Sequence, residues 1–142
     1  MNTASQVEEL SIYHQIQLPL DVFCLVHLRT LRVNSTPFVS QFELDDNTIS
    51  TSLSPLISRL NQVRVLSLIN TTASHIPSQA LAVLTNITIL EIENCGLREI
   101  PSTISLLTNL QQLRLPKNNL HSIPHSTGNF SKSLINNSVF SF

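Results

Sequence analysis

The chain has 142 residues, of which 42% are hydrophobic and 12% are charged, and its formal net charge is −1. This length predicts a single domain. The near-neutral charge argues against nucleic-acid and membrane-surface partners, which both require a basic face. No apolar run approaches the roughly 18 residues of a membrane-spanning helix, and the first ten residues, MNTASQVEEL, do not resemble a signal peptide. We therefore expect a cytoplasmic protein.

Groups of three apolar residues, spaced i, i+3 and i+5, recur along the chain. In chain order they are Val7, Leu10 and Ile12; Leu28, Leu31 and Val33; Val63, Leu66 and Leu68; Ile87, Leu90 and Ile92; and Leu110, Leu113 and Leu115. Their first members are 21, 35, 24 and 23 residues apart. Each of the last four groups is also preceded by apolar residues three and six positions earlier, such as Leu84 and Leu81 before Ile87. We expect one strand per group, over 7–12, 28–33, 63–68, 87–92 and 110–115.

The fourth and fifth groups begin two copies of a longer pattern. In each copy a turn residue, Cys95 or Asn118, follows the apolar residues, and an Ile-Pro pair ends the pattern at Pro101 or Pro124. Every member of the second copy lies 23 residues after its counterpart. A fixed period that carries L-x-x-L-x-L-x-x-N/C-x-L is the signature of leucine-rich repeats. The sequence resembles that family, and specifically its 23-residue intracellular type, as in Ras-suppressor and Scribble-like proteins.

The resemblance implies an α/β solenoid, or horseshoe, of about five repeats with a short parallel β-sheet on its concave face. We expect alternate strand side chains to point inward and the intervening ones to face solvent. The Asn118 side chain is expected to hydrogen-bond backbone groups that the turn leaves unpaired, and Ser78 and Ser102 to cap helical segments opposite the sheet. Cys24 and Cys95 would lie nearly three coils apart, so we expect both to be reduced, with Cys24 packed in the outer part of its coil.

Two segments depart from the repeat pattern. We assign residues 1–124 to the repeat domain, with a loop insertion at about 39–53, and residues 125–142 to a degenerate or truncated C-terminal repeat. The insertion is interpreted either as a protruding loop or as an acidic contact loop. Its acidic residues are Glu43, Asp45 and Asp46. Neither end of the domain has an evident polar cap, which predicts self-association through the ends or an origin in a longer repeat protein.

The concave strand face is the candidate binding site. Arg29, Arg32 and Arg64 are expected at matching positions of adjacent coils. Beside them lie three apolar residues at positions that should be exposed, namely Val65, Ile69 and Ile89. Arginine next to exposed apolar side chains is typical of protein interfaces, although ordinary surface residues would give the same pattern. The candidate partner-binding residues are Tyr13, Arg29, Arg32, Arg64, Val65, Ile69, Ile89, Glu91, Glu93 and Arg114.

Catalytic and metal-binding motifs are not found in the sequence. With only two glycines, Gly96 and Gly128, no phosphate-binding loop or nucleophile elbow can be written. The turn at Pro124 separates His121 from His125, which argues against a zinc site. We therefore predict that the protein is not an enzyme and uses no cofactor or metal.

Two functions remain from the sequence. The first is a non-catalytic protein–protein interaction module, such as a signalling scaffold, that binds a protein partner on the concave face. The alternative is a fragment of a larger leucine-rich repeat sensor or receptor of the immune or extracellular recognition type. Five N-x-S/T sequons occur, and those at Asn34 and Asn70 are expected on the binding face. Because no signal peptide is evident, we interpret them as unused.

Overall fold

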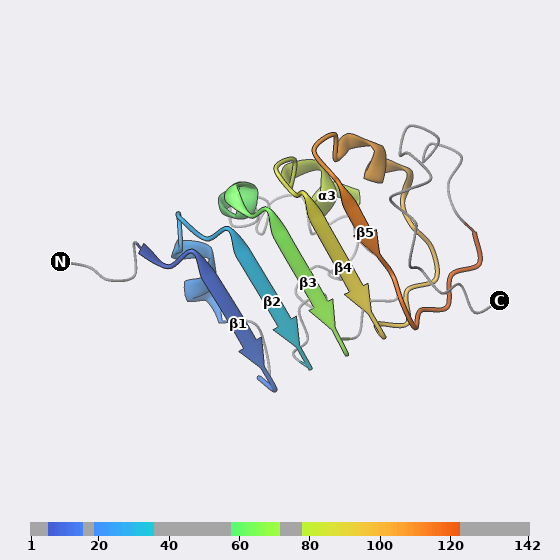
Figure 1. Cartoon of the computed structure of the whole chain (residues 1–142), viewed down its shortest axis with the longest axis horizontal. Coiled ribbons are helices and arrows are strands. Elements are labelled where there is room, and N and C mark those ends of the chain that lie inside the picture. Colours follow the sequence, from blue (N-terminus) through green and yellow to red (C-terminus); the bar gives the residue numbers. More distant parts are fainter. Residues whose placement is uncertain (1–5, 16–18, 36–57, 72–77, 123–142) are drawn as a thin grey trace.

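A single parallel sheet organises the computed structural model, which describes residues 6–15, 19–35, 58–71 and 78–122. Its strands are β1 (Glu9–Tyr13), β2 (Thr30–Asn34), β3 (Val65–Ile69), β4 (Ile89–Glu93) and β5 (Gln112–Arg114). They lie in chain order, β1-β2-β3-β4-β5, and all four neighbouring pairs are parallel. Figure 1 shows the five arrows side by side and pointing the same way. The expected parallel sheet, in which each apolar group forms one strand, is therefore confirmed.

Each strand begins two residues later than the sequence predicted. In the last four groups the cause is the hydrogen bonding of the first apolar residue. The backbone N–H of Ile87, for example, donates to Leu84 in its own coil, and the N–H of Leu110 donates to Leu107 in the same way. These residues belong to the turn that enters the strand, and bonding to the neighbouring coil begins only at the next residue.

Short helical segments connect the strands. They are the 3-10 helices η2 (Leu20–Cys24), η4 (Ser58–Gln62) and η5 (Ser102–Leu106) and the α-helix α3 (Ser78–Val83). The expectation that Ser102 caps a helix is wrong, because Pro101 occupies the N-cap position with φ −65° and makes no side-chain cap hydrogen bond. Pro101 itself is extended, with ψ 146°, so Ser102 is the first helical residue and does not occupy the cap position.

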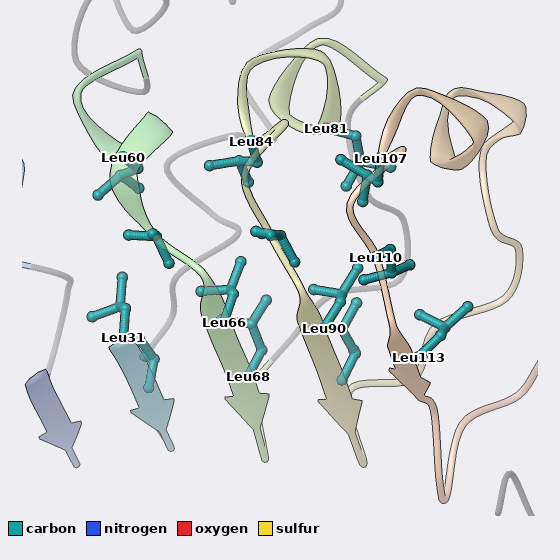
Figure 2. Close-up of a cluster of buried hydrophobic side chains, with 14 of the residues drawn as sticks. Leu31, Leu60, Leu66, Leu68, Leu81, Leu84, Leu90, Leu107, Leu110 and Leu113 are labelled. Atoms are coloured by element: carbon teal, nitrogen blue, oxygen red, sulfur yellow. The ribbon is translucent and has the colours of Figure 1, made fainter. Parts of the chain in front are cut away.

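One hydrophobic core lies between the sheet and the helical segments. From the sheet it includes Leu31, Leu66 and Leu90, and from the helical segments Leu60 and Leu81. Figure 2 shows leucines of neighbouring coils at matching heights, so that each stacks on its counterpart in the next coil. Burying a leucine side chain fully contributes roughly 1.5–3 kcal/mol, and this stacking supplies what a single coil cannot provide for itself.

Coverage of the core decreases toward both ends of the sheet. At the second position of the apolar groups, the exposed fraction is 0% for Leu31 and 1% for Leu90 but 8% for Leu113. Leu10, the equivalent residue of β1, is only partly buried. Among the described residues, the first and last strands have one neighbouring strand each, and their core side chains have correspondingly less cover from those residues.

Asn118 fills the turn that follows β5, as the sequence predicted. Its Oδ1 accepts from the backbone N–H groups of Cys95 (3.1 Å) and Leu97 (3.2 Å) in the preceding coil. Its Nδ2 donates to the carbonyls of Ile92 (2.6 Å), Leu115 (3.2 Å) and Pro116 (3.3 Å). One side chain therefore satisfies backbone groups of two adjacent coils, which would otherwise be unpaired beside the core.

Cys95 occupies the equivalent turn position one coil earlier. Its side chain is buried, and its Sγ lies 3.4 Å from Thr71 Oγ1, the turn residue of the coil before. Burial raises the pKa of the Cys95 thiol. Both cysteines are free, as predicted, but Cys24 is exposed, so the expectation that it packs in its coil is wrong. Cys24 is the last residue of the five-residue η2, which is too short to bury more than one side.

The expected insertion at 39–53 and the C-terminal segment 125–142 lie outside the described residues. Both assignments therefore remain predictions.

Replacing Asn118 with alanine should lower the free energy of unfolding by about 1–3 kcal/mol, because two backbone N–H groups and three carbonyls lose a hydrogen bond beside the core. The matched control is Asn119→Ala, since Asn119 is exposed and contributes its backbone N–H to Leu97 at 2.9 Å. That change should stay within about 0.5 kcal/mol. Urea denaturation followed by circular dichroism measures both, and equal effects would contradict the role of Asn118.

The buried Cys95 thiol predicts a loss of stability at alkaline pH. Its pKa is raised in the folded state, so the folded chain holds the proton over a range in which the unfolded thiol, with a pKa of about 8.5, has lost it. The free energy of unfolding should be unaffected by this group below pH ~8 and should decrease above it, up to the raised folded pKa. Denaturation curves at about pH 7 and about pH 10 should show a smaller decrease for Cys95→Ala than for Cys24→Ala. An equal decrease in both variants would refute this effect.

Candidate functional site

The strand side chains that point away from the core form what we call the open face of the sheet. From β1 to β5 they are Glu9, Ser11 and Tyr13; Thr30, Arg32 and Asn34; Val65, Ser67 and Ile69; Ile89, Glu91 and Glu93; and Gln112 and Arg114. The register aligns them in rows across the strands. In a parallel sheet, side chains of one row lie about 4.8 Å apart, within reach of their neighbours.

Two of the three predicted arginines occupy the same position of neighbouring coils. The backbone N–H of Arg64 donates to the carbonyl of Arg29 at 2.7 Å, just before β3 and β2 begin. Arg32 lies further along β2, opposite Ser67, so its predicted alignment with the other two is wrong. All three side chains are exposed, and none is ion-paired with a carboxylate of the described residues.

The three apolar residues predicted for the binding site do not form one patch: Val65 and Ile89 are neighbours, and Ile69 lies apart from them. Val65 lies opposite Ile89, and both are partly buried although they belong to the open face. Ile69 lies four residues further along β3, beyond Ser67. Tyr13 is 54% exposed at the end of the edge strand, two strands away from Ile69, so the structure does not bring it to the apolar pair.

Ser67 occupies the middle of the open face, between Arg32 on β2 and Glu91 on β4. Only 1% of its surface is exposed, because larger side chains surround it. Its Oγ donates a hydrogen bond of 2.7 Å to Glu91 Oε2. This bond fixes the Glu91 carboxylate in the centre of the sheet, and the sequence analysis did not anticipate it.

The acidic side chains of β4 are already neutralised within the chain. Glu91 Oε1 lies 3.8 Å from Nη1 of Arg114, and Glu93 Oε1 accepts from Nζ of Lys117 at 2.7 Å. Arg114 also donates to Gln112 at 2.7 Å. Such exposed pairs add little stability, typically 0–1 kcal/mol. They leave Arg32 and Glu9 on the open face, and Arg29 and Arg64 just before β2 and β3, without an ion-pair partner among the described residues.

An asparagine ladder borders the open face where the strands end. Asn94 Nδ2 donates to Asn70 Oδ1 at 2.8 Å, and Asn70 Nδ2 donates to Asn34 Oδ1 at 3.3 Å. Asn70 and Asn94 both have φ near +50°, a left-handed conformation that asparagine tolerates better than most residues. The sequence signal for this ladder was the 24-residue spacing of Asn70 and Asn94. Asn34 and Asn70 had been considered only as glycosylation sites.

No three histidine, cysteine, aspartate or glutamate side chains gather to hold a metal ion in the part of the chain that the structure describes. Among the described helices, none is long and apolar enough to cross a membrane. What the open face offers chemically is guanidinium donors beside apolar surface.

Comparisons with known proteins define the fold. A leucine-rich repeat protein of Leptospira interrogans superposes with a TM-score of 0.70 and 24% sequence identity, over 88% of this chain and 29% of that protein. A plant ice-binding protein superposes with a TM-score of 0.55 and 27% identity, over 84% of this chain and 37% of that protein. No family model and no curated protein matches the sequence. The chain therefore has a leucine-rich repeat fold and spans about a third of the length of these two structures.

Proposed function

We propose that this chain is a non-catalytic protein–protein interaction module of the 23-residue intracellular leucine-rich repeat type. Its partner lies across the open face, which we take to be the concave face of the solenoid. The leucine-rich repeat fold supports the general role, because stacked coils present an extended surface that is suited to binding. We further propose that the module acts in the cytoplasm as a signalling scaffold.

The observation that supports the site is a cluster of cations without ion-pair partners among the described residues, beside partly buried apolar side chains of the open face. We call it the basic–apolar cluster, and it consists of Arg29, Arg32, Arg64, Val65 and Ile89. Val65 follows Arg64 directly, lies opposite Ile89, and is one strand away from Arg32. Isolated apolar side chains on a surface are ordinary. Here, however, two of them meet beside three arginines whose charges the described residues do not neutralise.

The cluster favours a partner that carries an acidic and an apolar side chain close together. Arginine presents its N–H groups in a fork that matches a carboxylate, so Arg29, Arg32 and Arg64 are suited to an aspartate or glutamate. Val65 and Ile89 would then cover an adjacent apolar side chain. A basic segment is disfavoured at this cluster, because it would bring further positive charge next to three arginines that have no ion-pair partner among the described residues.

The alternative remains a fragment of a larger sensor or receptor of the immune or extracellular type. The chain covers 29% and 37% of the two similar structures, so repeat proteins of this fold that are longer than this chain exist, as the alternative requires. Asn70 is exposed and begins an N-T-T sequon. A glycan found by mass spectrometry on Asn70 of the native protein would support the extracellular alternative and exclude the cytoplasm.

Selection of random peptides displayed on phage, against the immobilised chain, tests the proposed site. The enriched peptides should carry an acidic residue next to an apolar one. Arg32→Glu should weaken their binding roughly tenfold or more, because a repulsive charge then replaces a fork that binds a carboxylate. The matched control is Arg98→Glu, which makes the same charge change at an exposed residue outside the strands.

Circular dichroism should show that both arginine variants remain folded. Enriched peptides without acidic residues, or peptides that bind the Arg32→Glu variant as tightly as the wild-type chain, would contradict the proposed site.

A further inference from the structure

The first strand, β1, is an edge of the sheet formed by the described residues. The core side chains of this first coil are less buried than the equivalent side chains of the next coil. Val7 and Leu10 are only partly buried, whereas their counterparts Leu28 and Leu31 are 1% and 0% exposed. At the end of β1, Tyr13 is the most exposed of the large hydrophobic side chains described. This edge therefore leaves both backbone and apolar surface available for another strand.

The backbone of β1 has a defined direction of hydrogen bonding. The carbonyl of Glu8 accepts from the N–H of Thr30 at 2.9 Å, and the N–H of His14 donates to the carbonyl of Asn34 at 3.0 Å. Because the N–H and C=O groups of a strand alternate sides with a period of two, even-numbered residues of β1 bond to β2. Glu9, Ser11 and Tyr13 consequently direct their N–H and C=O groups outward, away from the sheet. The carbonyl of Tyr13 there accepts a hydrogen bond of 3.2 Å from Nε2 of Gln15, which a pairing strand would have to displace.

We propose that a second copy of this chain pairs with β1 in antiparallel fashion, around a two-fold axis at Ser11. In this register Ser11 faces Ser11 of the partner subunit, and Glu9 faces Tyr13 of the partner subunit. It is the register in which all three outward-directed residues of β1 meet outward-directed residues of the second copy. Each such pair is of the hydrogen-bonded kind, so the pairing continues the sheet from one subunit into the other.

The side chains agree with this register on both faces of the sheet. On the core side, the partly buried Leu10 comes opposite Ile12 of the partner subunit, so that each copy covers the exposed end of the other's core. On the open face, Glu9 comes opposite the phenol of the partner's Tyr13, which can donate a hydrogen bond to the carboxylate. No glutamate faces a glutamate, although β1 and the residue before it contain two of them. The interface is thus self-complementary, as a two-fold axis requires.

Sedimentation equilibrium of the 142-residue chain tests the proposal. The wild-type chain should approach twice the monomer mass of 15.8 kDa as concentration rises. Tyr13→Glu should weaken dimerisation roughly tenfold, because it places like charges opposite Glu9 twice in each dimer. Adding Glu9→Lys to Tyr13→Glu should restore the dimer, since the paired positions then carry opposite charges.

The matched control combines Tyr13→Glu with Glu99→Lys, which makes the same change of charge at an exposed residue outside the strands and should not restore the dimer. Circular dichroism should show the fold intact in every variant. A wild-type chain that remains monomeric at all accessible concentrations would overturn the proposal. So would a dimer that Tyr13→Glu leaves unchanged, equal restoration by both lysine changes, or growth into oligomers larger than a dimer, which indicates head-to-tail pairing of β1 with β5.

Discussion

The stacking of each coil on the next is the constraint on which the rest of this structure depends. The strands are three to five residues long, and strands of that length are not stable alone. Each is held by backbone bonding to its neighbours and by rows of inward side chains such as Leu31, Leu66 and Leu90. The turn residues add a second connection, because Asn118 bonds to backbone groups of its own coil and of the preceding one.

The same stacking determines what the open face can do. Residues 23 to 24 positions apart become neighbours, which places Val65 beside Ile89 and pairs Glu93 with Lys117. The coil that contains residues 36–57 is longer, yet β2 and β3 still pair in register, so Arg29 and Arg64 are neighbours despite a separation of 35 residues. The charge of the face therefore follows from coil alignment, with paired charges over β4 and β5 and unpaired arginines over β2 and β3.

The repeat pattern was sufficient to predict the sheet, the core rows and the role of Asn118, because inward positions need apolar residues whatever their detailed contacts. It did not predict where strands begin, since that depends on whether the amide of a residue such as Ile87 bonds within its own coil or to the next. Nor did it predict that Ser67 would bind Glu91, or that Asn34, Asn70 and Asn94 would form a ladder. Those contacts depend on rotamers and on the competition among several polar neighbours, which spacing alone does not specify.

Residue-resolved hydrogen exchange under native conditions tests most directly whether stacking holds the fold together. If it does, protection should be graded along the solenoid, because a coil with two neighbours opens less often than one with a single neighbour. The account predicts the slowest exchange for the amides that join β3 and β4, such as that of Ile89, which donates to Arg64 in the preceding coil, and faster exchange for those of β1 and β5. Uniform protection across all five strands, or the slowest exchange in β1, would contradict it.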